Sequence, residues 1–153
     1  MTKRELEFVG AILYKCEGTR LRKDKRHPDG NTFYYQIDFT NSDPLLINLW
    51  LEFLRKILKP KEERLRVSLH LYKDHNKNKL IAFWSSLTGI PKNQFYNTQI
   101  YCAKNPKYKP NPFGTCKIRY IDKKTYLKLD EIIKKNLGKD ASLVKIVDNG
   151  RVA

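Results

Sequence analysis

Apolar and polar residues follow two different spacings along this chain, and the spacing changes several times. Alternation of apolar with polar residues predicts strands that bury one face, whereas apolar residues that recur every three or four positions predict helices. The strands are expected over residues 32–39, 64–72, 97–103 and 115–121. The helices are expected over residues 2–17, 44–59, 76–88 and 123–137.

Residues typical of helix ends support these bounds. Thr2 and Glu5 form the Thr-x-x-Glu pattern of a capping box. Gly18 suits the left-handed position that often follows a helix, and Asp43 followed by Pro44 is typical of a helix start. The first helix is apolar on two faces, so we expect it to be buried on two sides. These faces carry Leu6, Val9, Leu13 and Cys16, and Phe8 and Ile12.

The predicted order of elements is α-β-β-α-β-α-β-β-α, without an internal repeat, a linker or a low-complexity segment. The first strand comes from the basic stretch before the turn at residues 28–30, and it forms a hairpin with residues 32–39. This order indicates one α+β domain with an antiparallel sheet over residues 1–138, followed by a tail over residues 139–153.

Two registers are open for the first strand. If Leu21 is buried, Arg20 and Arg22 point outward, whereas the opposite register presents Lys23 and Lys25. Because side chains alternate between the two sides of a strand, these two pairs cannot share one face. The sequence leaves this choice open.

Charge is the strongest feature of the composition: 31 Lys and Arg stand against 16 Asp and Glu, a formal net charge of +15. Such an excess makes the folded state repel itself, so an anionic partner is expected. Nucleic acid is the commonest such partner, because each cation placed on a phosphate releases a condensed counterion. A ribosomal protein or a membrane-surface protein has the same composition.

The sequence argues against a zinc site, a secreted protein and a membrane protein. Cys16, Cys102 and Cys116 form no Cys-x-x-Cys pair and have no histidine near them in sequence, so three separate thiols indicate a reducing compartment. No stretch approaches the roughly 20 apolar residues that span a bilayer, and no signal peptide is recognisable. We expect a soluble, cytoplasmic protein without a small-molecule substrate.

The outward positions of the predicted strands carry side chains that recognise DNA. Gln and Asp hydrogen-bond adenine and cytosine, and Arg and Lys bind guanine or phosphate; a solvated sheet face is the plain alternative. Lysines in the loop at residues 104–114 are further candidates for phosphate contacts. The candidate DNA-binding residues are Arg20, Arg22, Lys23, Lys25, Arg26, Tyr34, Gln36, Asp38, Arg64, Arg66, Ser68, His70, Lys107, Lys109, Lys117 and Arg119.

The segment Cys16-Glu17-Gly18 at the end of the first helix resembles the motif of the LAGLIDADG homing endonucleases. In that family a helix ends in a small residue, an acid and a glycine, and then runs into a twisted antiparallel sheet. The segments FTNSDPLLINLWLEFLRKIL, GIPKNQF and FGTCKIRY are also similar to segments of the compact bacterial and archaeal branch. The resemblance covers residues 5–137.

This resemblance implies an αββαββα core with an extra helix inserted between strands, and a saddle-shaped antiparallel sheet on double-stranded DNA. The single motif implies a homodimer on a long pseudo-palindromic site, in which Glu17 of each subunit binds Mg²⁺ or Mn²⁺ for phosphodiester hydrolysis. Asn41 and Lys104 would be further catalytic residues. The dimer interface would comprise Val9, Gly10, Ala11, Ile12, Leu13 and Cys16.

Two positions depart from the family pattern: Ile12 stands where a glycine is usual, and Lys15 lies close to the expected metal site. Other hypotheses therefore stay open. The chain is alternatively a DNA-binding regulator that has lost cleavage, an RNA-binding maturase, or a basic ribosomal protein that needs no acid at this position.

Overall fold

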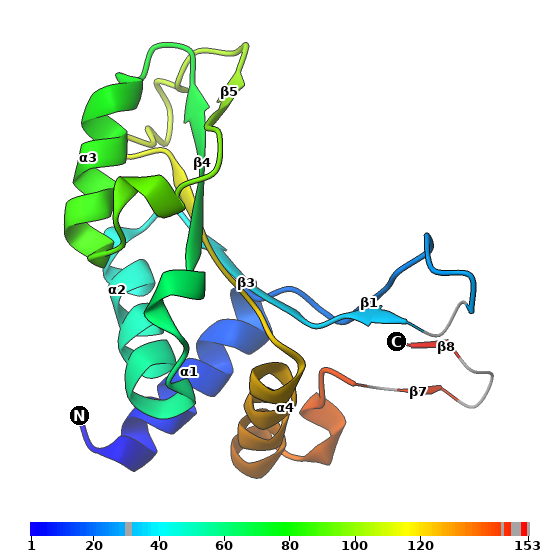
Figure 1. Cartoon of the computed structure of the whole chain (residues 1–153). Coiled ribbons are helices and arrows are strands. Elements are labelled where there is room, and N and C mark those ends of the chain that lie inside the picture. Colours follow the sequence, from blue (N-terminus) through cyan, green and yellow to red (C-terminus); the bar gives the residue numbers. More distant parts are fainter. Residues whose placement is uncertain (30–31, 145, 148–150, 153) are drawn as a thin grey trace.

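The computed structural model describes residues 1–29, 32–144, 146–147 and 151–152 (Figure 1). The helices are α1 (Lys3–Glu17), α2 (Pro44–Phe53), α3 (Lys77–Thr88) and α4 (Lys123–Leu137). The strands are β1 (Arg22–Lys23), β2 (Phe33–Tyr34), β3 (Gln36–Asn41), β4 (Arg66–Tyr72), β5 (Gln99–Tyr101), β6 (Thr115–Ile121), β7 (Ile146–Val147) and β8 (Arg151–Val152). From α1 to α4 the order of elements follows the prediction, except that the strand expected over residues 32–39 is divided into β2 and β3; two short strands, β7 and β8, then follow α4. The protein is thus of the mixed α+β class.

The central sheet has the order β3-β6-β4-β5. β6 is antiparallel to both β3 and β4, but β5 pairs with β4 in parallel. The expectation of a wholly antiparallel sheet is therefore wrong at this edge. The reason is that α3 connects β4 to β5 and carries the chain back, so that both strands run in the same direction. β1 with β2, and β7 with β8, form separate antiparallel hairpins.

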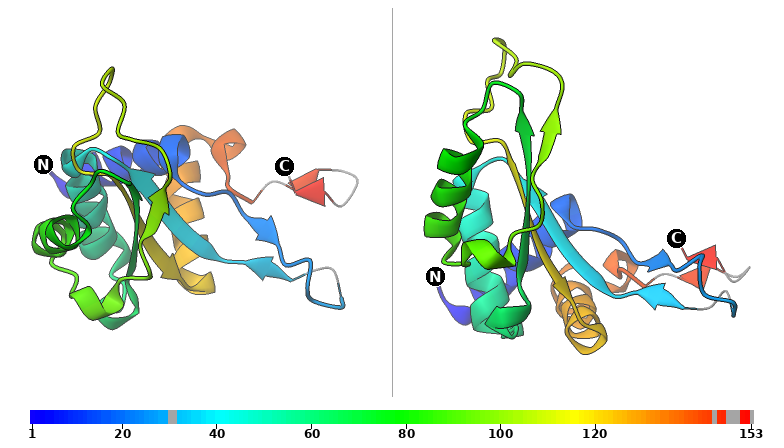
Figure 2. Two further views of the ribbon diagram at one scale, coloured as in Figure 1. Left: turned by 90° about the horizontal axis from the view of Figure 1, so that it is seen from above. Right: turned by 45° about the horizontal axis from the view of Figure 1, so that its top comes forward.

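All four helices lie on one side of the central sheet, and the opposite side carries no described helix (Figures 1 and 2). The β1–β2 hairpin continues from β3 and reaches away from the helices, to the right in Figure 1. Buried residues alternate along β4 and β6 with residues of intermediate exposure, as expected for strands covered on one face. The uncovered side is called the outward face below.

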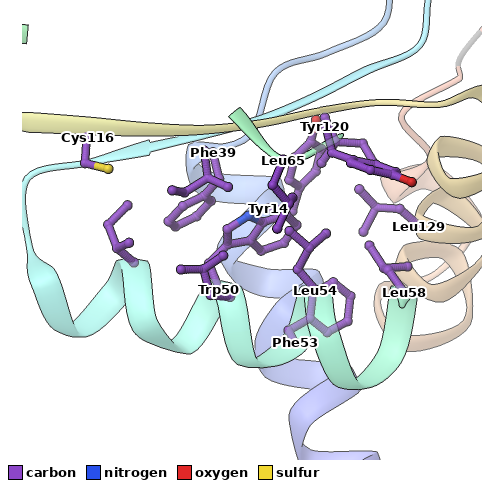
Figure 3. Close-up of a cluster of buried hydrophobic side chains, with 14 of the residues drawn as sticks. Tyr14, Phe39, Trp50, Phe53, Leu54, Leu58, Leu65, Cys116, Tyr120 and Leu129 are labelled. Carbon is purple, nitrogen blue, oxygen red and sulfur yellow. The ribbon is translucent and has the colours of Figure 1, made fainter. Parts of the chain in front are cut away.

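Trp50 of α2 joins the first helix to the sheet at the centre of the core (Figure 3). Its ring stacks on Tyr14 of α1 at a centroid distance of 5.3 Å and on Phe39 of β3 at 5.0 Å. All three side chains are almost completely buried, and each large aromatic burial contributes several kcal/mol, about 3–5 by truncation to alanine. This stack holds the C-terminal half of α1 against β3.

The buried face of α1 differs from the expected one. Leu6, Gly10, Ala11 and Tyr14 are buried, whereas Cys16 is exposed. A Cβ built on Gly10 would lie 2.1 Å from Cδ2 of Phe53, so a side chain is excluded there by the close approach of α2. On the second side, Phe8 and Ile12 are 46% and 39% exposed in the single chain.

The second helix begins as predicted, with the Asp43 carboxylate accepting a hydrogen bond of 2.8 Å from the amide of Leu45. It does not continue as an α-helix to residue 59. A π-helical segment over Leu54–Leu58 replaces its last turns and ends at Lys59, which has a positive φ of 55°. The wider turn lets three of these five residues, Leu54, Ile57 and Leu58, face the core.

The residues directly after α4 also pack on the core. Leu143 is buried, and its amide donates a hydrogen bond of 2.6 Å to the Asp130 carboxylate. Part of the expected tail therefore packs with the domain. No described helix is both long enough and apolar enough to cross a bilayer.

Candidate nucleic-acid interface

The strand register brings polar side chains together on the outward face. In β3 and β6, Asp38 pairs with Arg119, and Thr40 pairs with Lys117. Lys117 in turn pairs with Ser68 of β4. Because directly paired residues project to the same side of an antiparallel sheet, these five side chains form one continuous polar surface.

Glu17 reaches this surface through a tight junction between α1 and β3. The Gly18 amide donates to the Tyr14 carbonyl at 2.7 Å, and the Thr19 amide donates to the Asp38 carbonyl at 3.1 Å. The Tyr14 hydroxyl donates to the Thr19 carbonyl at 2.8 Å, and burial raises the pKa of this hydroxyl. These bonds hold the last residue of the helix at the edge of the outward face.

Gly18 has a different role from the expected one. Its φ of −83° and ψ of 160° are extended, so it is not a left-handed residue. A Cβ at this position would lie 2.4 Å from Cδ2 of Tyr14. Glycine is therefore needed because the chain turns from helix to sheet directly over the tyrosine ring.

Glu17 opens onto a cavity of about 280 Å³ that lies between the end of α1 and the strands. Polar and charged side chains supply most of its lining. The lining residues are Glu17, Gly18, Thr19, Arg22, Gln36, Asp38, Thr40, Lys117 and Arg119. Of the predicted DNA-binding residues, the structure thus places five beside the predicted metal ligand.

A second cavity of about 330 Å³ adjoins the first and is strongly basic. Its lining residues are Thr19, Arg20, Arg22, Lys23, Arg26, Tyr34 and Gln36. Arg26 donates to the Tyr34 hydroxyl and also approaches Asp24 at 3.5 Å. With four cations around one hollow, this cavity is suited to an anion such as a phosphate of a nucleic acid.

The structure decides the register of the first strand. Leu21 is only 7% exposed, and Arg22 pairs with Tyr34. Lys23 pairs with Phe33, its Nζ lies 5.9 Å from the centre of the Phe33 ring, and it still lines the second cavity together with Arg22. Lys25 is exposed and lines neither of these two cavities.

Asp38 is held by its neighbours and is not open to a ligand. Its side chain is 5% exposed. Its two oxygens accept hydrogen bonds from Nε of Arg119 at 2.9 Å and from Nη2 of Arg119 at 2.8 Å. Nε2 of Gln36 also donates to Oδ2 of Asp38 at 2.6 Å. The prediction that Asp38 contacts a base is therefore wrong, because its acceptors are taken within the chain.

Asn41 does not lie beside Glu17 in the structure. Because side chains alternate along β3, Asn41 shares the helix-facing side with Phe39. The Oδ1 atom of Asn41 accepts a hydrogen bond of 2.8 Å from the Asp43 amide. Thr40 lies on the outward face in its place and lines the cavity with Glu17.

Lys104 is also distant from Glu17. It follows β5, where the Ala103 carbonyl accepts the amide of Lys73, just beyond the end of β4. Gly18 forms an isolated β-bridge with Phe39. Phe39 pairs with Ile118 of β6, and Ile118 pairs with Val67 in the first half of β4. From Val67, level with Gly18, to Lys73, level with Ala103, the strand direction spans six residues, roughly 20 Å at about 3.3 Å per residue. Lys117 is the lysine that lines the cavity.

The other candidates divide into two groups. Arg66, Ser68 and His70 lie on the outward side of β4, as predicted. Burial and the nearby Lys117 lower the pKa of His70, which favours the neutral form of this side chain. Arg64 instead lies in the turn before β4, where it approaches Asp122 at 3.6 Å. Lys107 and Lys109 are exposed in the loop between β5 and β6.

Few acids neutralise the outward face. Asp38 is the one acid in the sequences of β3, β4 and β6, and Arg119 is its partner. Arg20, Arg22 and Lys117 make no ion pair with any residue that the structure describes. Among the described residues of these strands and the end of α1, the outward face is thus positively charged around the exposed carboxylate of Glu17.

The predicted interface residues on α1 do not share one face. Gly10 and Ala11 are buried against the protein's own core and are therefore wrong as exposed interface residues. Ile12 and Cys16 are exposed, and Val9 and Leu13 are partly buried. Lys15 donates to the Ala141 carbonyl at 2.8 Å, so it turns toward the segment after α4.

Carboxylates that are open to a metal are scarce at this site. No group of three or more His, Cys, Asp or Glu suited to a metal ion occurs among the described residues. Glu17 and Asp38 are the two acids of the cavity, and Asp38 is already bonded to Arg119. One chain therefore offers one carboxylate, and Mg²⁺ would need a further ligand from outside it.

Sequence reasoning missed Thr19, Thr40 and Tyr96 as members of this surface. The ring centre of Tyr96 lies 5.8 Å from Cζ of Arg119. The alternation along β3 was enough to find Thr40, whereas Tyr96 precedes β5 and only the fold brings it to β6. Comparison with models of known families, with curated proteins and with solved structures gives no match for this chain.

Proposed function

We propose that this protein binds duplex DNA on its outward face and, as a homodimer, cleaves it with the help of Mg²⁺ or Mn²⁺. The observation that carries the proposal is the position of Glu17 in one cavity with Arg22, Lys117 and Arg119. Such a site places an acid for a metal among cations for phosphates. It agrees with the resemblance to the LAGLIDADG homing endonucleases.

The binding step rests on charge and shape. The cations of the two adjoining cavities hold phosphates, while Gln36, Arg119 and Ser68 project from the strands where base edges would lie. The β1–β2 hairpin extends this surface beyond the helices (Figure 1). A two-stranded ribbon of this kind fits the major groove.

The exposed side of α1 supports a dimer. Phe8, Ile12 and Cys16 are spaced by four residues, so they form one exposed stripe, and this stripe ends next to Glu17. Two such stripes packed around a twofold axis bury the exposed Phe8 and Ile12 and bring the two Glu17 carboxylates close together. The pair then supplies the second acid that one chain lacks.

Within that arrangement each group has a defined role. The two Glu17 carboxylates would hold the metal ion, and the metal would supply polarisation of the scissile phosphate and activation of water. Lys117 and Arg22 carry no ion pair with the described residues, and they stabilise negative charge on the phosphate. Thr19 and Gly18 hold the helix end in place through their bonds to Asp38 and Tyr14.

The observation of a single open carboxylate among several cations favours a second candidate, a DNA-binding regulator without cleavage. Both candidates use the same surface. They differ only in whether two Glu17 side chains meet and hold a metal.

The experiment has two stages. The protein first selects its site from a pool of random duplexes by binding without metal, and cleavage of the selected duplex is then followed with Mg²⁺ or Mn²⁺. Glu17→Gln keeps the size of the side chain and removes its charge. We expect it to abolish metal-dependent strand cleavage with DNA affinity close to that of the wild type.

Glu63→Gln is the matched control, because Glu63 is also exposed but lies in the turn before β4 and does not line the cavity. It should cleave like the wild type. Binding without cleavage by the wild-type protein, in either metal, would establish the regulator instead. A complex that contains one protein chain per DNA site in sedimentation would contradict the shared metal.

A further inference from the structure

We propose that Arg119 recognises a guanine in the major groove and that Asp38 is the residue that positions it. This inference rests on the proposed binding of duplex DNA, and it adds the base that the outward face selects. It also gives Asp38 a role other than contact with a base.

The Asp38–Arg119 pair is unusual in its place on the molecule. It lies on the uncovered side of the sheet, yet the Asp38 side chain is only 5% exposed, against 24% for Arg119. Removing a carboxylate from water costs several kcal/mol, and an ion pair often returns little more than this cost. The pair is therefore explained poorly by stability alone, and better by the orientation it imposes on the arginine.

Three neighbours fix the guanidinium plane. The Asp38 carboxylate accepts hydrogen bonds from Nε of Arg119 at 2.9 Å and from Nη2 of Arg119 at 2.8 Å, a two-point contact. Gln36 donates to the same carboxylate at 2.6 Å and so holds Asp38 in turn. On another side, the Tyr96 ring centre lies 5.8 Å from Cζ of Arg119. A pre-oriented arginine loses less conformational freedom when it binds a ligand.

The donors that Asp38 leaves open match one base. A guanidinium has five N–H groups, and Asp38 uses the edge formed by Nε and Nη2. The end formed by Nη1 and Nη2 carries a second pair of parallel N–H groups that Asp38 does not use, and the Tyr96 side chain is the other polar neighbour of this guanidinium. Guanine presents two adjacent acceptors, O6 and N7, in the major groove, whereas adenine presents one acceptor beside a donor. The open end of Arg119 therefore fits guanine and opposes adenine.

The first test uses wild-type protein and modified DNA. In the selected duplex, each guanine is replaced in turn by 7-deazaguanine, which lacks the N7 acceptor. We expect one position in each half-site to lose affinity by about 5- to 150-fold, the range that a two-point arginine–guanine contact contributes. Equal affinity for every modified duplex would overturn the inference.

The second test uses variants. Arg119→Lys keeps the charge but has no two-point fork, so it should lose the penalty for 7-deazaguanine at that position. Arg55→Lys is the matched control, because Arg55 makes the same kind of two-point contact through Nε and Nη2, with the Glu62 carboxylate, but lies in the π-helical segment and not on the outward face. It should keep the penalty. An unchanged penalty in Arg119→Lys would also overturn the inference.

Asp38→Asn separates positioning from charge. A purely electrostatic role predicts tighter binding to every duplex, since a negative charge is removed. A positioning role predicts a smaller preference for guanine, and circular dichroism shows whether the variant folds. If Asp38→Asn does not fold, the 7-deazaguanine scan and Arg119→Lys still decide whether Arg119 recognises guanine, and Asp38→Glu, which keeps the charge but shifts the carboxylate, tests the positioning role through the same guanine preference.

The result also separates this inference from the proposed function. Strong, salt-sensitive binding to DNA without a guanine preference would leave the proposed function in place and refute the role of Arg119. No binding to any duplex would refute both.

Discussion

Replacing Gly10 by alanine tests the packing of α1 directly. The Cβ of alanine would lie 2.1 Å from Cδ2 of Phe53, whereas ordinary contacts begin at about 3.4 Å. The ring must therefore move by more than an ångström. Phe53 is completely buried and its ring centre lies 5.3 Å from that of Trp50, so there is little room for this movement.

Two energies of opposite sign decide the outcome. Overpacking of a core costs about 1–3 kcal/mol, and alanine is favoured over glycine within a helix by about 0.8–1.0 kcal/mol. We expect Gly10→Ala to lower the free energy of unfolding by about 1 kcal/mol. For a domain of this size the melting temperature then falls by roughly 2–4 °C.

Denaturant unfolding of four proteins gives the assay: the wild type, Gly10→Ala, Phe53→Leu and the double variant. Because leucine removes the ring that obstructs the new methyl group, alanine at position 10 should be neutral or stabilising in the Phe53→Leu background. Asn48→Ala, on the exposed side of α2, is the control for helix propensity alone.

A Gly10→Ala protein that is more stable than the wild type by about 1 kcal/mol, the full helix-propensity gain, would refute the close approach of α1 to α2. Additive effects of the two substitutions would refute it as well. In either case Gly10 would be free to face a partner subunit, as the resemblance to the LAGLIDADG family implies.

Two further predictions concern charge. In a plot of log K against log salt concentration, affinity for duplex DNA should fall linearly, and Arg20→Ala should reduce the slope by about 1 per chain. Lys79→Ala on α3 is the control; a slope for Arg20→Ala equal to that of the wild type would contradict a phosphate contact. In acid, Asp122 should contribute to unfolding, because hydrogen bonds from Thr125 hold its pKa below the ordinary value of 3.8. A lowered carboxyl pKa gives stability that is present at neutral pH and lost as the pH falls below 3.8. Asp122→Asn should therefore reduce the loss of unfolding free energy between neutral and acid pH, and an unchanged loss would contradict this role.

Several local features were predictable because they depend on neighbours in sequence. The capping box of Thr2 and Glu5, the Asp43 cap and the buried side of β4 all follow from short patterns, and the structure confirms each. Glu17 was identified as the last residue of its helix. Its surroundings were predicted in part, since Arg22 and Lys117 were DNA-binding candidates before their partners were known.

Features that depend on partners far apart in sequence were not predictable. Asp38 was read as free to bind a base, but Arg119, 81 residues away, occupies its acceptors. Gly10 was assigned to a dimer interface because its small size permits a close approach, and the sequence does not say which helix approaches. The parallel pairing of β5 likewise depends on where α3 returns the chain.

The sequence by itself determined the order of the main helices and strands from α1 to α4, the excess of positive charge and the single acid at the end of α1. Those properties depend on residue identity and on spacings of two to four positions, which the chain carries locally. Only the tertiary structure decided which side of α1 is buried, which lysine lies beside Glu17 and which outward residues are already bonded to one another. These depend on strand register and helix packing, where a shift of one residue moves a side chain to the opposite face.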